Sequence, residues 1–325
     1  MTLSFRKALL IYTLIPIISI FIAFTIENLV TIKNETQQLI EQHMIDLSVS
    51  YANIFDGFLK PIEGAAKTNA DLIELHQDVT EEDIYQLLEL QVEHNPIIYG
   101  AAVAFMPRQF DENRRLVAPY VYRKKGKLKR MDIGESGYDY TDSEWEWWND
   151  TVATGQARWT EPYFDEGAGN ILMSTYSVPF YRDGNLWGVS TVDISLHEIS
   201  DKIQIPGVNV QDISVLSSRG LIILSPKQEI IGKSIFDVVR QGFHKALELH
   251  GKEDRKTIEA NEGRILDSID AMMAGKTGMA DLTSLQNMEN FWYFFAPIKS
   301  AKWSFSIQVK ESEVFESVYQ RAWYS

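Results

Sequence analysis

Three tryptophans crowd into four positions of the stretch SEWEWWND, residues 143–150, among acidic side chains. An indole face attracts a cation, and a neighbouring carboxylate can accept the hydrogens of an ammonium group. Trp145, Trp147 and Trp148 therefore suit a binding surface or a catalytic cleft. They also suit a core, because Trp145 and Trp148 lie three residues apart and would share one helix face, which would leave Trp147 exposed.

The composition limits the class of protein and its partners. A chain of 325 residues with 45% hydrophobic residues is long and apolar enough for about two folded domains. Its net charge of −14 argues against a nucleic-acid partner, since neutralising phosphates needs a basic face. The absence of cysteine excludes disulfides and thiolate metal sites and suits a domain outside the cell. The six histidines lack metal-binding spacing, so we expect no metal and no cofactor.

The N-terminus predicts a membrane anchor. The run ALLIYTLIPIISIFIAF is uncharged, and we expect residues 8–30 to form a transmembrane helix. Arg6 and Lys7 precede it, so the positive-inside rule leaves residues 1–7 in the cytoplasm and the remainder outside. A cleaved signal peptide is the alternative, but its apolar stretch would be shorter and a small-residue cleavage site would follow. The sequence therefore predicts a body outside the membrane, held there by this helix.

Two helices are expected after the anchor. Apolar residues recur every three to four positions across residues 31–75, which predicts a long stalk helix with a bend or a break at Pro61. The apolar stripe could pack on the globular body, on a second copy of the chain, or on both, and we expect a homodimer. Thr80 is the predicted N-cap of the next helix, which should end before Pro96.

Strands and short helices then alternate in two similar parts. The basic run RKKGKLKR is interpreted as a solvated hairpin tip, and the tryptophan stretch as a short helix capped by Ser143 and closed by Gly155. The endings LWGVSTVDISLHEIS and KWSFSIQVKESEVFES repeat a strand followed by a short helix. We expect an α+β fold with antiparallel sheets in residues 76–205 and 206–310, joined by the linker IPGVN, and a helix returning to the membrane in residues 311–325.

The segments WTEPYFDEGAGNILMSTYSVPF, GVSTVDISL and LSSRGLIILSPKQEIIGKSIFDV resemble the double Cache family of extracytoplasmic sensor domains. The resemblance extends from about residue 33 to residue 312. It implies two tandem PAS-like units on a long helix, with a small ligand bound in the membrane-distal unit. Such domains belong to bacterial transmembrane receptors, and they pass the signal to a phosphatase, cyclase, kinase or chemotaxis module. The resemblance therefore implies a periplasmic or extracellular body anchored in a bacterial inner membrane. The resemblance thus implies a sensor rather than an enzyme.

The family's binding positions can be carried over from its amino-acid sensors. The arginine that clamps a ligand carboxylate falls on Trp145, and an indole cannot make two charge-assisted hydrogen bonds. What is kept suits the ammonium end of a ligand, so an amine or another organic cation is expected, with an amino acid, a purine or a sugar as alternatives. The remaining family positions fall on Trp147, Trp148, Tyr163, Asp165 and Asp193, and further wall candidates are Tyr138, Tyr140 and Tyr176.

Two other functions are open at this point. Asp165 and Asp193 could be the carboxylate pair of a glycoside hydrolase, with the tryptophans stacked on sugar rings. A catalytic cleft has no need of a membrane stalk, which favours the sensor. The domain could also be a dimerisation scaffold without a ligand. The motif AGKTG is no phosphate loop, because Asp270 stands where such a loop has its first glycine.

Overall fold

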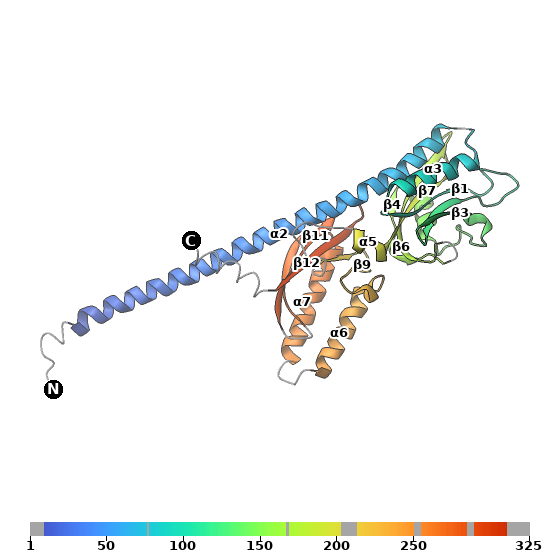
Figure 1. Cartoon of the computed structure of the whole chain (residues 1–325). Coiled ribbons are helices and arrows are strands. Elements are labelled where there is room, and N and C mark those ends of the chain that lie inside the picture. Colours follow the sequence, from blue (N-terminus) through green and yellow to red (C-terminus); the bar gives the residue numbers. More distant parts are fainter. Residues whose placement is uncertain are drawn as a thin grey trace. The chain divides into compact units, whose positions relative to one another are not determined.

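The structure is a computed structural model that describes residues 10–76, 78–166, 169–202, 213–249, 255–284 and 289–310. The chain divides into two compact units, Met1–Leu47 and Ser48–Ser325. The predicted fold class is confirmed: a long N-terminal apolar helix is followed by two antiparallel sheets (Figure 1). The predictions for residues 1–7, for the linker IPGVN and for a helix in residues 311–325 fall outside the described residues.

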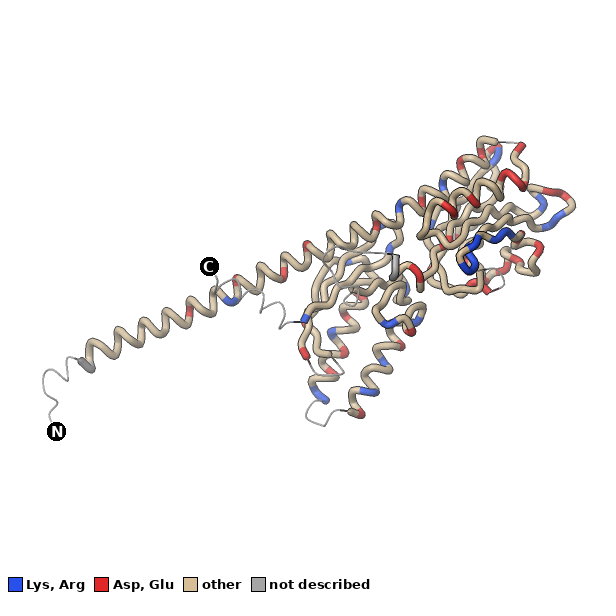
Figure 2. Tube along the Cα trace, in the orientation of Figure 1, with Lys and Arg blue, Asp and Glu red and all other residues tan. Residues whose placement is uncertain are grey.

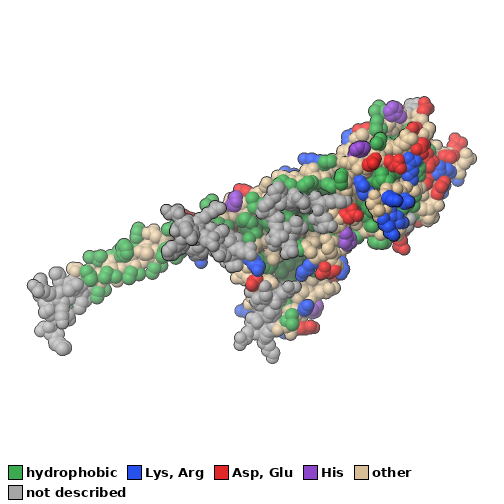
Figure 3. Space-filling model, viewed as in Figure 1, with side chains coloured by type: hydrophobic (Ala, Val, Ile, Leu, Met, Phe, Trp, Pro, Cys, Tyr) green, Lys and Arg blue, Asp and Glu red, His purple; other side chains and the backbone are tan. Residues whose placement is uncertain are grey.

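The first unit contains the start of helix α2 (Ile15–Leu75), preceded by a short π-helix, η1 (Leu10–Leu14). Its large apolar side chains are exposed, and they cover this part of the helix in Figure 3. Charged residues are sparse here (Figure 2). Among the described residues α2 is the one helix long and apolar enough to cross a membrane, with a mean hydropathy of 2.0 in its most apolar stretch.

Pro61 lies inside α2 and does not interrupt it, so the predicted break is wrong. A proline inside a helix removes one backbone hydrogen bond and crowds the preceding turn. The neighbouring side chains of Leu59 and Ile62 are almost completely buried. Their packing offsets the local loss and carries the helix on to Leu75.

The sheet within residues 76–205, the predicted membrane-distal unit, is called the distal sheet. It has seven antiparallel strands in the order β3-β2-β1-β7-β6-β4, with β5 paired to β6. All eight residues of β1 are buried, as expected for a central strand covered on both faces. The strands are β1 (Ile98–Phe105), β2 (Pro119–Lys124), β3 (Lys127–Asp132), β4 (Arg158–Trp159), β5 (Tyr163–Phe164), β6 (Leu172–Arg182) and β7 (Asn185–Ser195), and the helices are α3 (Glu81–His94), η2 (Ile133–Glu135), α4 (Glu146–Thr154) and α5 (Leu196–Lys202).

The helix ends test the predicted caps. Thr80 caps α3, and Asp83 completes a reciprocal capping box, as its position in the first turn allows. Gly155 closes α4 in the left-handed conformation, with φ of 63°. Ser143 does not cap α4: the helix begins at Glu146, and its N-cap residue Trp145 makes no side-chain capping bond. The indole of Trp145 is instead used in packing on Tyr138.

The proximal sheet has five antiparallel strands in the order β10-β11-β12-β8-β9. The sequence around Ile235 to Leu249 predicts a helical stretch, and helix α6 confirms it with the same limits. Helix α7 was not predicted, although Ile258, Ile265, Ile269 and Met272 recur at helical spacing. The elements are β8 (Ile213–Leu216), β9 (Ile222–Leu224), η4 (Gln228–Ile230), α6 (Ile235–Leu249), α7 (Arg255–Met273), β10 (Gly278–Thr283), β11 (Asn290–Ile298) and β12 (Trp303–Lys310).

Side chains of the two sheets contact each other directly. The rings of Trp159 on β4 and Trp303 on β12 lie 5.4 Å apart between centroids. Arg219, in the β8–β9 turn, donates to both carboxylate oxygens of Glu146 at 2.9 and 2.7 Å. Glu146 is the first residue of α4, so the tryptophan helix of the distal unit is tied to the proximal unit.

Candidate functional site

One face of the distal sheet gathers polar residues from neighbouring strands. Thr175 of β6 lies opposite Asp193 of β7, and Gly100 of β1 lies opposite Asp193 on the other side. A Cβ atom on Gly100 would stand 2.5 Å from the Tyr120 hydroxyl oxygen. Because Gly100 has no side chain, the Tyr120 ring of β2 has room beside Asp193.

Two buried carboxylates face this side of the sheet. Asp165 and Asp193 are each 5% exposed, and neither forms an ion pair with a residue that the structure describes. Asp193 accepts a hydrogen bond from the Thr175 hydroxyl at 2.7 Å. Asp165 accepts one from the backbone N–H of Gly169 at 2.5 Å and one from the Tyr138 hydroxyl at 3.4 Å. Burying a carboxylate without a countercharge is costly, and a cation beside this pair would lower that cost.

The pKa values of Asp165 and Asp193 reflect the burial of both carboxylates. Burial raises the pKa of Asp193 to about 7; the Thr175 hydrogen bond opposes the rise and the nearby Asp165 charge adds to it. Burial also raises the pKa of Asp165, against hydrogen bonds from Gly169 and Tyr138. A bound cation would reverse both shifts, because an opposite charge favours the ionised form.

Hydroxyl groups connect the aromatic residues to the carboxylates. When Asp193 is ionised, Thr175 gives it its one hydroxyl hydrogen, so Tyr163 is then the donor in the 2.8 Å contact between Tyr163 and Thr175. The Trp147 indole N–H donates to the Tyr138 hydroxyl at 3.2 Å, and Tyr138 donates onward to Asp165. Each carboxylate thus lies at the end of a short chain of donors.

Tyr120 stands apart from these chains. Its hydroxyl lowers the pKa of Asp193, so the two groups are near each other. The hydroxyl nevertheless has no hydrogen bond of standard geometry with the described residues, and it is buried. A buried hydroxyl that makes no hydrogen bond of standard geometry can still donate one to a ligand.

These side chains surround one small cavity. Its volume of about 10 Å³ is room for about one water molecule. Five of the nine predicted site residues meet here: Tyr138, Trp147, Tyr163, Asp165 and Asp193. Among the described residues its lining carries no lysine or arginine. The full lining is Ala102, Tyr120, Ile133, Tyr138, Trp147, Tyr163, Asp165, Thr175, Thr191 and Asp193.

The other four predicted residues lie outside the lining. Trp145 is half-buried and stacks on Tyr138, with ring centroids 4.1 Å apart. Trp148 packs edge-on against Tyr140 at 4.7 Å, and the Tyr140 hydroxyl donates to the Phe105 carbonyl at 2.6 Å.

Tyr176 is turned to the other face of the sheet. Neighbouring strand residues alternate in direction, so Thr175 in the cavity places Tyr176 opposite, against Trp159 at 5.3 Å. The expectation that Trp147 is exposed in a packed helix is also wrong, since Trp147 is 4% exposed and Trp148 is 3% exposed. Both indoles are buried, and only Trp147 reaches the cavity.

Sequence reasoning missed Tyr120, Thr175 and Thr191, which complete the polar lining. Strand alternation carries a signal for one of them: Thr191 lies two residues before Asp193 and must share its face. Thr175 and Tyr120 depend on the pairing of β6, β7, β1 and β2, which no local pattern fixes.

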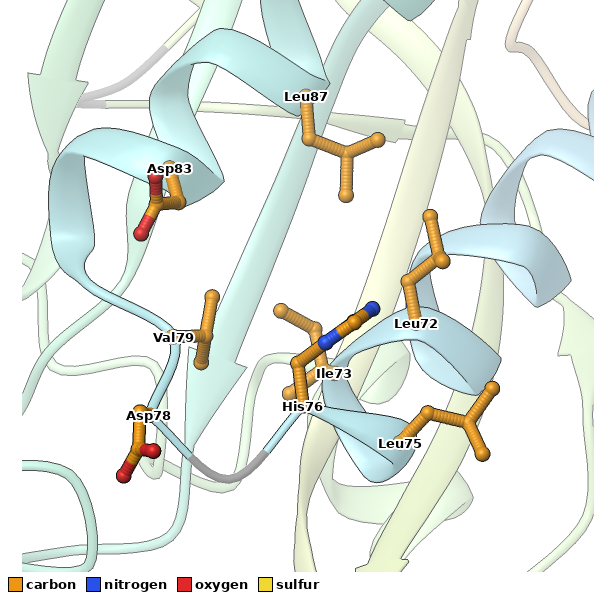
Figure 4. A pocket seen from close by; sticks show the side chains of 8 residues that line it. All are labelled: Leu72, Ile73, Leu75, His76, Asp78, Val79, Asp83 and Leu87. Carbon is orange, nitrogen blue, oxygen red and sulfur yellow. The ribbon is translucent and has the colours of Figure 1, made fainter.

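A larger hollow lies between the end of α2 and the start of α3 (Figure 4), with a volume of about 540 Å³. The ring of His76 and the carboxylates of Asp78 and Asp83 stand apart around it in Figure 4. Asp83 is engaged in capping α3. Among the described residues no group of three His, Asp or Glu is placed to hold a metal. We therefore assign no ligand or metal site to this hollow.

Known proteins match this arrangement. The family described as "Methyl-accepting chemotaxis protein-like, first PDC sensor domain" matches residues 84–201. The methyl-accepting chemotaxis protein PctB of Pseudomonas aeruginosa is 24% identical over 264 residues, which is 77% of this chain. This chain spans 37% of the length of PctB.

Solved sensor domains have the same fold. The extracellular domain of soHK1S-Z6, assigned as a histidine kinase, is 27% identical with a TM-score of 0.65, over 89% of this chain and 99% of that one. The ligand-binding domain of the P. aeruginosa PAO1 amino-acid chemoreceptor PctC, solved with GABA, is 16% identical with a TM-score of 0.53, over 83% and 99%.

The two antiparallel sheets on one long helix, together with these matches, define the fold of the chain. Residues 84–201 match the first PDC sensor domain of methyl-accepting chemotaxis protein-like proteins, and the chain as a whole has the fold of solved extracellular sensor domains with two PDC, or Cache, units. These matches are to sensor domains of receptors, which favours the sensor over the hydrolase considered from the sequence.

Proposed function

We propose that the distal cavity binds the ammonium group of a small organic cation and that the chain reports this binding across the membrane. One observation carries the proposal: two buried carboxylates face one cavity, without an ion pair to any described residue. The ligand would supply the missing positive charge.

The contacts available are of the right strength for a sensor. A cation against the Trp147 face gains about 0.5–2 kcal/mol, and a charge-assisted hydrogen bond to Asp165 or Asp193 adds about 1.5–3 kcal/mol. After the cost of ordering the ligand, these sums correspond to dissociation constants of roughly micromolar to millimolar. A receptor that must release its ligand needs this range.

An amine fits better than an amino acid. The described lining has no lysine or arginine to hold a ligand carboxylate, and Trp145, at the position of the family's arginine, packs behind Tyr138. The related domains were solved with amino acids or GABA, and all of these ligands carry an amino group. The ammonium end is therefore the part of the ligand that this cavity shares with its relatives.

Binding requires the cavity to widen. It holds about one water molecule, so a larger ligand has to displace part of the wall. Helix α4 is the short element that brings Trp147 to the cavity, and its first residue is bonded to Arg219 of the proximal unit. A shift of α4 would thereby reach the proximal sheet. We further propose that residues 8–30 cross a bacterial inner membrane and that the receptor works as a dimer.

The test is a thermal-shift screen of primary amines, polyamines, amino acids, purines and sugars, followed by calorimetry on the hits. Asp165→Asn and Asp193→Asn should each weaken binding of a cationic hit by about tenfold or more. Asp142→Asn is the matched control, since Asp142 is exposed in the same segment. If no amine binds, or if the control weakens binding as much, the proposal fails and the scaffold interpretation gains.

A further inference from the structure

A second hollow lies in the proximal unit, between the sheet and helix α6. Its volume of about 740 Å³ is in the range of pockets that hold drug-sized molecules. Helix α6 packs on α7 (Figure 1), and residues of both helices and of strands β8, β10, β11 and β12 line the hollow. The hollow is therefore bounded by regular elements.

The lining has an apolar side and a polar side. Helices α6 and α7 contribute Val238, Val239, Ala246, Leu249 and Ile265. Across from them, the sheet contributes Phe291 and Tyr293 together with the polar side chains of Ser214, Thr283 and Gln308. Such a division suits a molecule with an apolar body and a polar head.

The charge of the lining is opposite to that of the chain. The chain carries −14, yet the described lining contains no aspartate or glutamate. Its two charged residues are Lys227 and Lys245, both exposed at the edge of the hollow. Neither lysine forms an ion pair with a residue that the structure describes. Two free ammonium groups beside an apolar wall are complementary to an anion with an apolar body.

We propose that this hollow is a second ligand site, which takes an amphipathic organic carboxylate with an aryl or alkyl body. The carboxylate would lie between Lys227 and Lys245, and the body would pack on Val238 and Phe291. The open apolar surface favours an occupant, because side chains facing a void forgo dispersion contacts that a ligand restores. This site does not depend on the distal cavity or on its amine.

The experiment uses the whole chain in lipid nanodiscs, with empty nanodiscs as the blank. The probes are 3-phenylpropionate, the amine 3-phenylpropylamine and the neutral alcohol 3-phenylpropanol, which share one body and differ in charge. Calorimetry should show the carboxylate bound at least about tenfold more tightly than the amine, since two lysines attract one and repel the other.

Variants then locate the site. The double variant Lys227→Gln/Lys245→Gln should weaken 3-phenylpropionate by about tenfold and leave 3-phenylpropanol unchanged. Val238→Trp should fill the hollow and weaken both. Lys256→Gln, an exposed lysine on α7 away from the lining, is the matched control and should change neither. Asp193→Asn should also leave 3-phenylpropionate binding unchanged, which separates this proposal from the distal one.

A readout on the unaltered chain covers the case in which a variant fails to fold. A diazirine derivative of 3-phenylpropionate should crosslink to α6 or β11 when mapped by mass spectrometry. Equal affinity for carboxylate and amine, or crosslinks confined to other elements, would overturn the proposal. Absence of binding by 3-phenylpropionate and of any crosslink would overturn it as well.

Discussion

The distal and proximal sheets are both antiparallel, but the cavities beside them are lined by side chains of opposite charge. The distal cavity has room for about one water molecule, and two buried carboxylates line it. The proximal hollow is about 740 Å³, with two lysines at its edge and no acidic residue in its described lining. On our two proposals, the same type of fold offers a ligand cavity in each unit, and the residues at a few positions set the sign of the ligand's charge.

The largest effect should come from the buried charge itself. The folded chain raises the pKa of Asp193 from 3.8 to about 7, so between these values the unfolded chain releases a proton that the folded chain keeps. The free energy of unfolding therefore falls as pH rises from about 4 to about 7 and then levels off. Asp193→Asn should remove this fall and stabilise the empty domain above pH 7 by on the order of a few kcal/mol.

Urea unfolding of both chains at pH 4, 5.5, 7 and 8.5 measures this difference. Lys245→Gln at the proximal edge serves as the comparison and should keep the pH dependence of the original chain. Parallel curves for the original chain and Asp193→Asn would show that Asp193 is ionised in the folded state, and the contrast between the two cavities would weaken.

A smaller effect concerns ligand affinity. A cation binds the ionised form of Asp193, so affinity for an amine should rise up to about tenfold per pH unit below 7 and level off above it. Affinity for 3-phenylpropionate at the proximal lysines should stay flat over pH 5.5–8. Calorimetry in buffers with different ionisation heats would also detect the proton released on amine binding. An amine affinity without pH dependence would contradict the role of Asp193.

Two half-buried tyrosines allow a matched comparison of about 1 kcal/mol. Tyr163 donates to Thr175, which holds Asp193, whereas Tyr293 contacts Ser306 at 2.6 Å in the proximal sheet. Tyr163→Phe and Tyr293→Phe should each lower the free energy of unfolding by about that amount. Only Tyr163→Phe should also move the pH dependence, because it loosens the donor to Asp193. Carbon-13 NMR of labelled aspartate carboxyls measures the shift in the pKa of Asp193.

The smallest effect on stability is expected at the contact between the units. Arg219 and Glu146 are partly exposed, so Arg219→Ala should cost under about 1 kcal/mol. The same variant should nevertheless weaken any response of the proximal unit to an amine, measured by hydrogen exchange in β8 and β9 with and without ligand. Arg130→Ala, which removes a bidentate contact with Glu89 inside the distal unit, is the control. An unchanged proximal response in Arg219→Ala would assign coupling to other contacts.

Local patterns in the sequence predicted much of the fold. The Thr80 cap, the left-handed Gly155 and the limits of α6 depend on neighbouring residues, and the structure confirms them. The lining of the site was harder to predict from the sequence, because it depends on which strands pair and on how far a helix is rotated about its axis. Trp147 and Trp148 are adjacent and both buried, yet only one reaches the cavity. No spacing rule gives the cavity volume either, since that results from packing.

Helix α2 carries two further contacts whose spacing has a mechanical consequence. Glu63 accepts from the Trp159 indole N–H of the distal sheet at 2.9 Å, and Asp56 accepts from the Ser300 backbone N–H of the proximal sheet at 3.0 Å. The two acids are seven residues, or about two turns, apart and so project from the same side of helix α2. A slip by one residue would turn both acids away by about 100° and break both attachments together. Helix α2 therefore cannot slide in a way that breaks its contact with one sheet and keeps its contact with the other.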